Sequence, residues 1–365
     1  MTTSTATRDG ARKRAPRRAL ASYELPAPAI FKPRRVGSFF TPDYKAIMAA
    51  AAQWRAEHGI APRRLDLMTV AMAIIDQQKT FVLKDGELSI APASIQDTLN
   101  LCEFIYRNAR VLSDLIFTLD SHTLFQIFHP LFWVDATGNH PEGFTAILPA
   151  DVGTKWFVNP EMSFIIFGDM RQVEWLVKYA RAYTQSLADN GKPPLVVWPV
   201  HGRLGSPGHA IVPSLQTAAD MHAIARWSRT RYLLKGQKPL SENYSPFGSE
   251  VVEIEIDGTK HVVGESSDEA IDELLAYDIL IFAGEAESHC VRAGLYDVLK
   301  RIKAKCPEKV GNCYILENCT SPVPGFEAQG KACIADMKGE GMHIVNSYTP
   351  MHQWPGPAQR LFAGK

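Results

Sequence analysis

Residues 279–302, with the sequence ILIFAGEAESHCVRAGLYDVLKRI, decide the fold of this chain. The apolar run ILIFA has the length and composition of a fully buried strand, and Gly284 then permits a tight turn. The rest of the segment reads as a helix. A continuous apolar strand that leads directly into a helix is the repeating unit of a parallel sheet covered by helices on both faces.

The same alternation of strand and helix continues outward from this segment. Further apolar runs precede Asp76 (LMTVAMAII), Asp120 (DLIFTL) and His201 (PLVVW). In an open parallel sheet, functional residues gather at the carboxyl ends of the strands. We therefore predict an α/β fold in which these three residues and the Gly284 loop converge on one edge of the sheet.

Two helices between the strands carry further signals. Residues 171–190 predict a helix, which Gly191 and two nearby prolines end. The apolar side chains on one face of this helix are Val173, Leu176, Ala180, Tyr183 and Leu187. Ser266 and Glu269 have the spacing of a capping box before the helix that begins AIDELLAY.

The composition describes a large chain with balanced charge. Of 365 residues, 46% are hydrophobic, and 39 Lys and Arg match 39 Asp and Glu. Zero net charge gives no electrostatic reason to expect nucleic acid or an anionic membrane as a partner, and no apolar run is long enough to span a bilayer. We expect one domain over residues 61–365, preceded by an extension over residues 1–60 that is largely disordered or peripheral.

The cysteines favour a reducing compartment, and we expect a cytoplasmic protein. The 6 cysteines form no C-x-x-C pair, and the N-terminal residues do not resemble a secretory signal. Residues 1–35 are rich in Ser, Thr, Pro, Arg and Lys, which favours a disordered basic tail over an organellar transit peptide.

Three residues have the chemistry of a thiol-dependent enzyme. Cys290 is expected at a helix start, where free N–H groups lower a thiol pKa and can hold an oxyanion, although a structural cysteine is the commoner reading of that segment alone. Asp76 at a strand end would be partly desolvated and suited to proton transfer, whereas a lone Asp more often caps a loop. Lys235 ends RYLLK and either extends outward or stabilises a thiolate and a carboxylate.

Asp120 and His122 could share a metal ion. They lie two residues apart at a strand end, so both side chains point to the same side, and His201 could complete an open site. Scattered Asp and His residues are weak evidence when taken alone. Further histidines, which we interpret as surface or core residues, are His129, His140 and His209.

Five strings, in order, resemble the motifs of the isochorismatase-like cysteine hydrolases, a family that includes nicotinamidases. The strings are DQQKTF, LDSH, WPVHG with SPGH shortly after it, LLKG followed by NYSPFGSEV, and GEAESHCV. Each string is weak evidence, whereas five in the same order are specific. They span residues 68–345, apart from a long insertion at about 131–194.

The resemblance implies a three-layer αβα, Rossmann-like fold with a central parallel sheet of about six strands. The implied catalytic residues are Asp76, Lys235 and Cys290. The implied ligands of a divalent metal ion, expected to be zinc, with iron or manganese as alternatives, are Asp120, His122 and His201. The implied oxyanion hole, which follows a cis Glu285–Ala286 bond, consists of the N–H groups of Ala286 and Cys290. The residues that match the walls of the nicotinamidase substrate pocket are Phe81, Trp198 and Tyr244.

We therefore predict a cysteine-dependent amidohydrolase, expected to form homo-oligomers, that cleaves a small nicotinamide-like carboxamide to an acid and ammonia through a thioester. Ser121 stands where nicotinamidases usually carry an aromatic residue, and Gly202 where a cysteine often follows. Other amidases of the family, of the carbamoyl, ureido or biuret type, are therefore alternatives. Isochorismate is disfavoured, because family members that split it generally lack the nucleophilic cysteine. Outside enzymes, the alternative is a non-catalytic binding protein, although none of the key residues is missing.

Overall fold

The computed structural model describes residues 23–362 and is built around a six-stranded sheet. All of its strand pairs are parallel, in the order β12-β11-β10-β1-β2-β7. The strands are β1 (Val70–Ile75), β2 (Asp114–Asp120), β7 (Arg231–Lys235), β10 (Ile279–Gly284), β11 (Cys313–Leu316) and β12 (His343–Val345). The predicted parallel sheet is confirmed.

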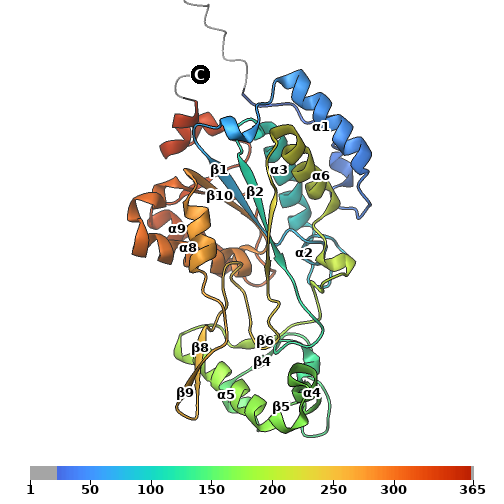
Figure 1. Cartoon of the computed structure of the whole chain (residues 1–365), viewed down its shortest axis with the longest axis vertical. Coiled ribbons are helices and arrows are strands. Elements are labelled where there is room, and N and C mark those ends of the chain that lie inside the picture. The colour runs from blue at the N-terminus through green and yellow to red at the C-terminus, as the bar shows by residue number, and fades with distance from the viewer. Residues whose placement is uncertain (1–22, 363–365) are drawn as a thin grey trace, which may run out of the picture.

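Helices cover both faces of this sheet and give the molecule its three layers (Figure 1). The helices on one face are α3 (Ala93–Asn108) and α6 (Pro213–Arg226), with α1 (Tyr44–His58) packed against α6. Those on the other face are α7 (Asp268–Leu275), α8 (Arg292–Lys305) and α9 (Glu327–Gly339). Alternate residues of β1 enter the two separate cores, which explains why that strand is apolar throughout. The predicted αβα class is confirmed.

The described part of the N-terminal extension lies on the outside of this body. Asp43 caps α1 by accepting a hydrogen bond of 3.0 Å from the Ala46 N–H, and Gly59 (φ 58°) ends the helix. The side chains that α1 buries in the core are Ile47, Ala51 and Trp54. Residues 1–22 of the predicted basic tail lie outside the described residues.

The predicted insertion forms most of a second, smaller lobe, which lies beyond the carboxyl ends of the strands (Figure 1). Its strands pair antiparallel: β3 (Trp133–Val134) with β5 (Phe157–Val158), β4 (Thr145–Ile147) with β6 (Leu195–Val197), and β8 (Glu253–Ile256) with β9 (Thr259–Val262). Its helices are α4 (Glu161–Phe167) and α5 (Val173–Asp189). The lobe has its own hydrophobic core, to which α5 contributes one face, so the helix predicted over residues 171–190 is confirmed.

Two local predictions are wrong. The run PLVVW does not form a strand of the central sheet, because Leu195 and Val197 pack in the core of the lobe and their strand, β6, pairs with β4. The capping box is absent from α7, because that helix begins at Asp268 and Glu269 is then its second residue instead of its third. The Ser266 hydroxyl instead accepts a hydrogen bond of 3.3 Å from the Asp268 N–H.

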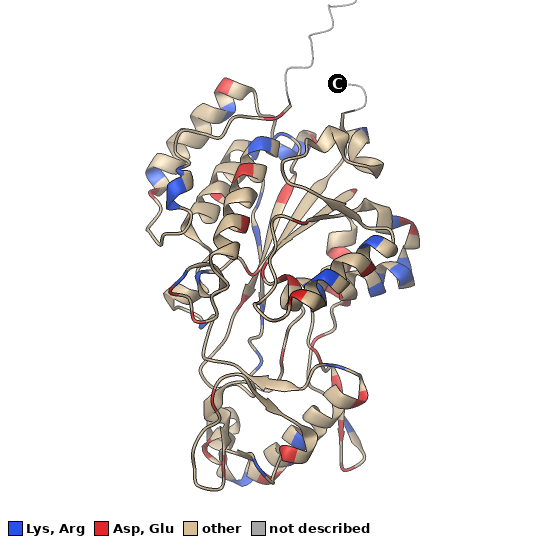
Figure 2. Ribbon diagram, turned by 180° about the vertical axis from the view of Figure 1, so that it is seen from behind, with Lys and Arg blue, Asp and Glu red and all other residues tan. Residues whose placement is uncertain are grey.

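Charged residues of both signs are interspersed along the helices of both lobes (Figure 2). Within residues 23–362, none of the helices is both long enough and apolar enough to cross a membrane.

Candidate active site

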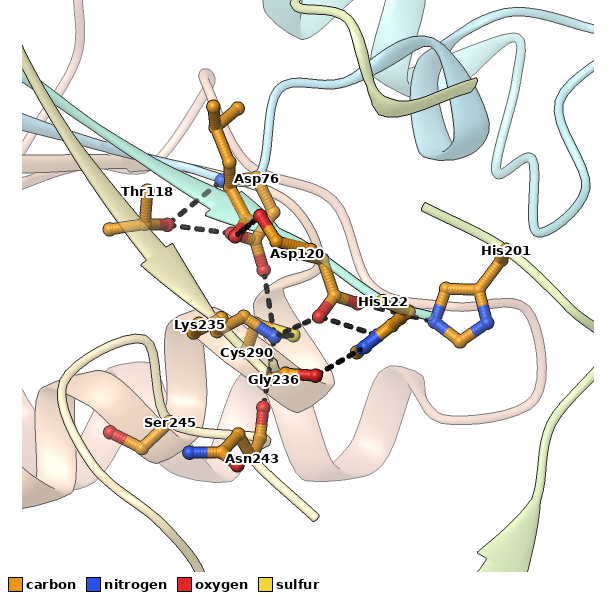
Figure 3. Close-up of polar contacts among 12 residues, drawn as sticks. Asp76, Thr118, Asp120, His122, His201, Lys235, Gly236, Asn243, Ser245 and Cys290 are labelled. Atoms are coloured by element: carbon orange, nitrogen blue, oxygen red, sulfur yellow. Dashed lines mark hydrogen bonds and ion pairs between the residues drawn. The ribbon is translucent and has the colours of Figure 1, made fainter. Parts of the chain in front are cut away.

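The predicted catalytic residues lie close together (Figure 3) at the carboxyl ends of four neighbouring strands of the six-stranded sheet. Asp76 follows β1, Asp120 ends β2 and Lys235 ends β7, and the β2–β7 register places Asp120 opposite Lys235. Cys290 lies in the π-helical turn Glu287–Val291, which follows β10 and runs directly into α8. The three charged residues are buried, and Cys290 is partly buried.

Asp76 is fixed by its own backbone and by the neighbouring strand. Its backbone is left-handed (φ 46°), which turns the chain at the end of β1. The Thr118 hydroxyl donates a hydrogen bond of 2.6 Å to Asp76 Oδ1, and Lys235 Nζ lies 3.3 Å from Asp76 Oδ2. Burial raises the pKa of Asp76 against the opposing attraction of Lys235. The carboxylate is therefore a stronger base than an exposed aspartate.

The Lys235 ammonium connects the carboxylates to the thiol. It donates hydrogen bonds of 2.9 Å to Asp120 Oδ1 and to the Asn243 carbonyl, and it lies 3.6 Å from Cys290 Sγ. Burial alone would lower the pKa of Lys235, but Asp120 and Asp76 together raise that pKa well above its ordinary value. The ammonium therefore stays charged at neutral pH.

The thiol of Cys290 differs from the sequence-based expectation. Burial raises the pKa of Cys290 well above its ordinary value, and nearby Asp76 and Asp120 raise it further, against the lowering effect of Lys235. The prediction of a lowered thiol pKa is wrong for the free site, because burial raises the pKa of Cys290 by more than the Lys235 ammonium and the partial charge of a helix start can lower it. The resting thiol is protonated and needs a base.

Asp120, His122 and His201 form a cluster whose ligand atoms all lie within 4.8 Å of one another. His122 Nε2 lies 2.7 Å from Asp120 Oδ1, and His201 Nε2 lies 3.2 Å from Oδ2. The other ring nitrogens face backbone carbonyls, His122 Nδ1 at 3.1 Å from Gly236 and His201 Nδ1 at 2.7 Å from Pro199. If each Nδ1 donates to its carbonyl, a lone pair on each Nε2 faces a carboxylate, which is unfavourable unless a cation lies between them. These donors fit a divalent metal ion.

His129 lies beside this cluster and is buried, in agreement with its interpretation as a core histidine. Its ring centroid is 5.8 Å from that of His122 and 6.0 Å from that of His201. Its Nδ1 faces the Leu124 carbonyl at 3.2 Å, whereas Nε2 has no hydrogen-bond partner among the described residues. Burial lowers the pKa of His129 to about 3, so the ring is neutral and adds a further nitrogen donor near the cluster.

The two remaining histidines considered from the sequence lie outside the cluster. His140 is exposed, and its Nδ1 contacts the Trp133 carbonyl at 2.7 Å. His209 Nε2 contacts the Ser121 hydroxyl at 2.8 Å. These contacts explain the positions of the two rings without a metal ion.

A cavity of about 340 Å³ opens beside Cys290 and Lys235. The three predicted pocket residues line it: Phe81, Trp198 and Tyr244. The sequence did not single out the other apolar and aromatic residues of its wall, which are Leu88, Ile90, Phe144, His289, Val323 and Pro324. Of these, His289 could have been noticed as the neighbour of Cys290, whereas Phe144 comes from the insertion and has no local signal.

Glu242 is a further buried group of this cavity that was missed from the sequence. Its Oε1 accepts a hydrogen bond of 2.8 Å from the Asn243 N–H, and its Oε2 accepts one of 3.2 Å from Trp198 Nε1. Burial raises the pKa of Glu242 to about 7. Its place two residues before Tyr244 in the string ENYSPF was the available signal.

The loop before Cys290 contains Ala286, one of the two residues of the predicted oxyanion hole. The Glu285–Ala286 peptide bond is cis, and Ala286 lines the cavity. The Ala286 N–H donates no hydrogen bond to any of the described residues. The Glu285 carboxyl group is buried beneath this loop and accepts hydrogen bonds from Gln77 Nε2 and the Ser321 N–H, each at 3.2 Å.

No family model matches the sequence, and no curated protein matches it either. Solved structures that match include a pyrazinamidase of Pyrococcus horikoshii in complex with zinc, at 16% identity and a TM-score of 0.41, over 76% of this chain and 98% of that one. A yeast nicotinamidase bound to the inhibitor nicotinaldehyde matches at 12% identity and a TM-score of 0.47, over 76% and 100% of the two chains.

A nicotinamidase and pyrazinamidase of Acinetobacter baumanii matches at 15% identity and a TM-score of 0.43, over 77% of this chain and 97% of that one. These proteins are of the kind that the five sequence strings resemble. At such identities and scores the likeness by itself decides nothing about activity, which has to be inferred from the residues of this chain.

Proposed function

We propose that this chain is a cysteine-dependent amidohydrolase that converts a small carboxamide to a carboxylic acid and ammonia. The observation that carries the proposal is the position of Lys235 Nζ, 3.3 Å from Asp76 Oδ2 and 3.6 Å from Cys290 Sγ, beside a cavity of about 340 Å³. A buried base, a thiol and a fixed cation in contact with both are the parts that generate a thiolate at neutral pH.

In the first step, Asp76 accepts the thiol proton while Cys290 Sγ attacks the carboxamide carbon. The pKa of Asp76, raised by burial, favours this transfer. Lys235 stabilises the sulfur as it becomes negative. The amide oxygen becomes an oxyanion, which accepts hydrogen bonds from the N–H groups of Ala286 and Cys290.

In the second step, protonated Asp76 gives its proton to the amide nitrogen, the carbon–nitrogen bond breaks and ammonia leaves. The remaining acyl group is a thioester on Cys290. Asp76 then accepts a proton from a water molecule that attacks the thioester carbon. The acid is released when the carbon–sulfur bond breaks, and the proton returns to the sulfur.

Asp120, His122 and His201 would hold a divalent metal ion, and we propose zinc, with iron or manganese as alternatives. When bound, such an ion supplies a local positive charge and a Lewis acid. Asp120 also accepts the 2.9 Å hydrogen bond from Lys235 Nζ, so the carboxylate that would bind the metal fixes the ammonium beside the thiol. The Asp120 side chain therefore links the proposed metal ligands to the proposed catalytic lysine.

The walls of the cavity favour a planar substrate without negative charge. Phe81, Trp198 and Tyr244 offer ring surfaces, and Glu242 offers a buried carboxyl group to a polar atom of the substrate. Among the described residues that line the cavity, Lys235 is the only lysine or arginine, and its charge is already engaged by two carboxylates. A nicotinamide-like amide fits these walls, whereas ureidoacrylate and isochorismate would each bring an uncompensated carboxylate.

The experiment is a panel of amides read out as ammonia: nicotinamide, pyrazinamide, biuret and ureidoacrylate. We expect the neutral ring amides to be hydrolysed with the highest kcat/KM. Preferred turnover of biuret would select the carbamoyl-type alternative. If no member of the panel releases ammonia from the metal-loaded protein, the amidase proposal is wrong.

A further inference from the structure

We infer that Phe144, which the inserted lobe supplies, is a specificity-determining residue that limits how far a substrate can extend from Cys290. The identity of the substrate rests on the proposed amidase function. The steric limit itself concerns access to the thiol and can be tested without any turnover.

Phe144 is an exposed aromatic residue at the cavity. It lines the cavity that Cys290 also lines, and 63% of its surface is accessible to solvent. Its ring meets that of Trp198 edge to face, with centroids 5.7 Å apart and planes at 84°. An accessible phenyl ring that packs on a pocket wall instead of in the core of its own lobe is placed to contact a ligand.

The backbone of Phe144 adopts a conformation that a phenylalanine disfavours. Its φ of 71° lies in the left-handed region, which bulky residues rarely occupy. The residue is held there by its N–H group, which donates a 2.6 Å hydrogen bond to the Val197 carbonyl. Such strain persists where the surroundings impose it, and a hypothesis of function follows from the observed outlier.

The neighbouring residues tie this loop to the catalytic side of the cavity. Gly143 packs so closely on Pro199 that an added Cβ would lie 2.9 Å from Pro199 Cγ. Thr145, which follows Phe144, begins β4 and pairs with Val197 of β6. The chain continues from β6 into Trp198 and His201. Because β4 and β6 pair antiparallel, the backbone that carries Phe144 is held beside the segment that leads to Trp198 and His201.

The first test measures alkylation of Cys290, located by mass mapping of peptides, with iodoacetamide and with a bulky N-naphthyl iodoacetamide. For Phe144→Ala we expect the ratio of bulky to small reagent rates to rise about tenfold, as for other groups that fill a pocket. For Phe144→Trp we expect the ratio to fall. The matched control is Phe164→Ala, because Phe164 is a 57% exposed phenylalanine of the same lobe that does not line the cavity.

The second test compares kcat/KM for nicotinamide and for quinoline-3-carboxamide, which carries one more ring. Phe144→Ala is expected to favour the larger amide by a similar factor. Alkylation ratios that stay equal in the wild type, Phe144→Ala and Phe144→Trp would overturn the inference, even if the amides are hydrolysed. If the ratios change as expected but no amide is hydrolysed, the steric role stands and the proposed amidase function fails.

Discussion

The two sides of the Asp120 carboxylate, one facing Lys235 and the thiol and the other facing the histidines, differ in whether their charges are balanced without a metal ion. On the thiol side, the Lys235 ammonium contacts both Asp76 and Asp120, so each carboxylate has a positive partner. On the histidine side, burial lowers the pKa of His122, and the rings of His122 and His201 face the same Asp120 carboxylate. Two carboxylates and one ammonium leave a net negative charge in a buried place, which a divalent cation at the histidines would offset.

This difference assigns separate tasks to the two sides. The thiol side contains a base, a nucleophile and a cation, and can perform bond making and proton transfer by itself. The histidine side places the ligand atoms of Asp120, His122 and His201 within 4.8 Å of one another and is suited to binding a cation. Substitutions on one side should therefore change turnover while metal content stays constant, and substitutions on the other should change metal content first.

The largest effect is expected for Cys290→Ala. We expect ammonia release to fall by about 10⁴-fold or more, because no other group can form the thioester. Metal content and the unfolding transition should match the wild type, since the thiol ligates nothing in the histidine cluster. The matched control is Cys306→Ala, because Cys306 is also a partly buried free thiol but lies after α8. Residual turnover by Cys290→Ala near the wild-type rate would remove this residue from the mechanism.

Next in size is the effect of Asp76→Asn. The amide keeps the volume and can still accept the 2.6 Å hydrogen bond from the Thr118 hydroxyl, but it cannot take a proton. We expect kcat to fall by about 10²–10⁴-fold, the usual contribution of a positioned general base. Activity should be measured against pH with metal content in parallel. A variant as active as the wild type at neutral pH would show that another group deprotonates the thiol.

The half of the site that could be predicted from the sequence lies directly after apolar strands. Asp76, Asp120 and Lys235 each end or follow a strand of the parallel sheet. The carboxyl ends of parallel strands lie at the same edge of the sheet, independently of the loops and helices that connect them. Cys290 was placed by the same rule and by the glycine turn before it. These are local signals, and the sheet topology converts them into proximity.

The rest of the site depends on contacts between segments that are distant in the chain. His201 reaches the cluster from a strand of the lobe, and Phe144 and Glu242 enter the cavity because the lobe packs over it. No local pattern marks Phe144, whereas the strings WPVHG and ENYSPF carried signals for His201 and Glu242 without showing how those segments reach the cavity. The raised pKa of Cys290 was likewise beyond the sequence, because it is a sum of burial and of charges contributed by other strands.

A smaller effect is expected for His201→Ala, on the histidine side. Loss of a ligand should weaken metal binding by at least about 10–100-fold, a loss that even supporting residues of metal sites produce. Elemental analysis after dialysis should show reduced metal per chain, whereas Cys290 should still be alkylated by iodoacetamide. The control is His140→Ala, because His140 is exposed and contacts only the Trp133 carbonyl among the described polar groups. Equal metal content in both variants would exclude His201 as a ligand.

The smallest effect concerns Asp97 and Glu285. These two buried carboxyl groups lie beneath the loop before Cys290 and belong neither to the thiol side nor to the histidine side of Asp120. Burial raises the pKa of Asp97 to about 6, and Glu285, which is fully buried beside it, has a pKa raised well above its ordinary value. The folded protein therefore binds more protons than the unfolded chain between pH 4 and 6, approximately, so the free energy of unfolding falls as pH rises through this window.

Asp97→Asn removes one titrating group from this pair and keeps an acceptor for the Ser321 hydroxyl. We expect the wild type to lose about 1–2 kcal/mol more stability than the variant between pH 4 and pH 7, measured by urea unfolding at several pH values. Metal content and the alkylation of Cys290 should be the same in both proteins, because the pair contacts neither side of Asp120. Parallel stability curves for the two proteins would mean that Asp97 ionises alike in the folded and unfolded chains.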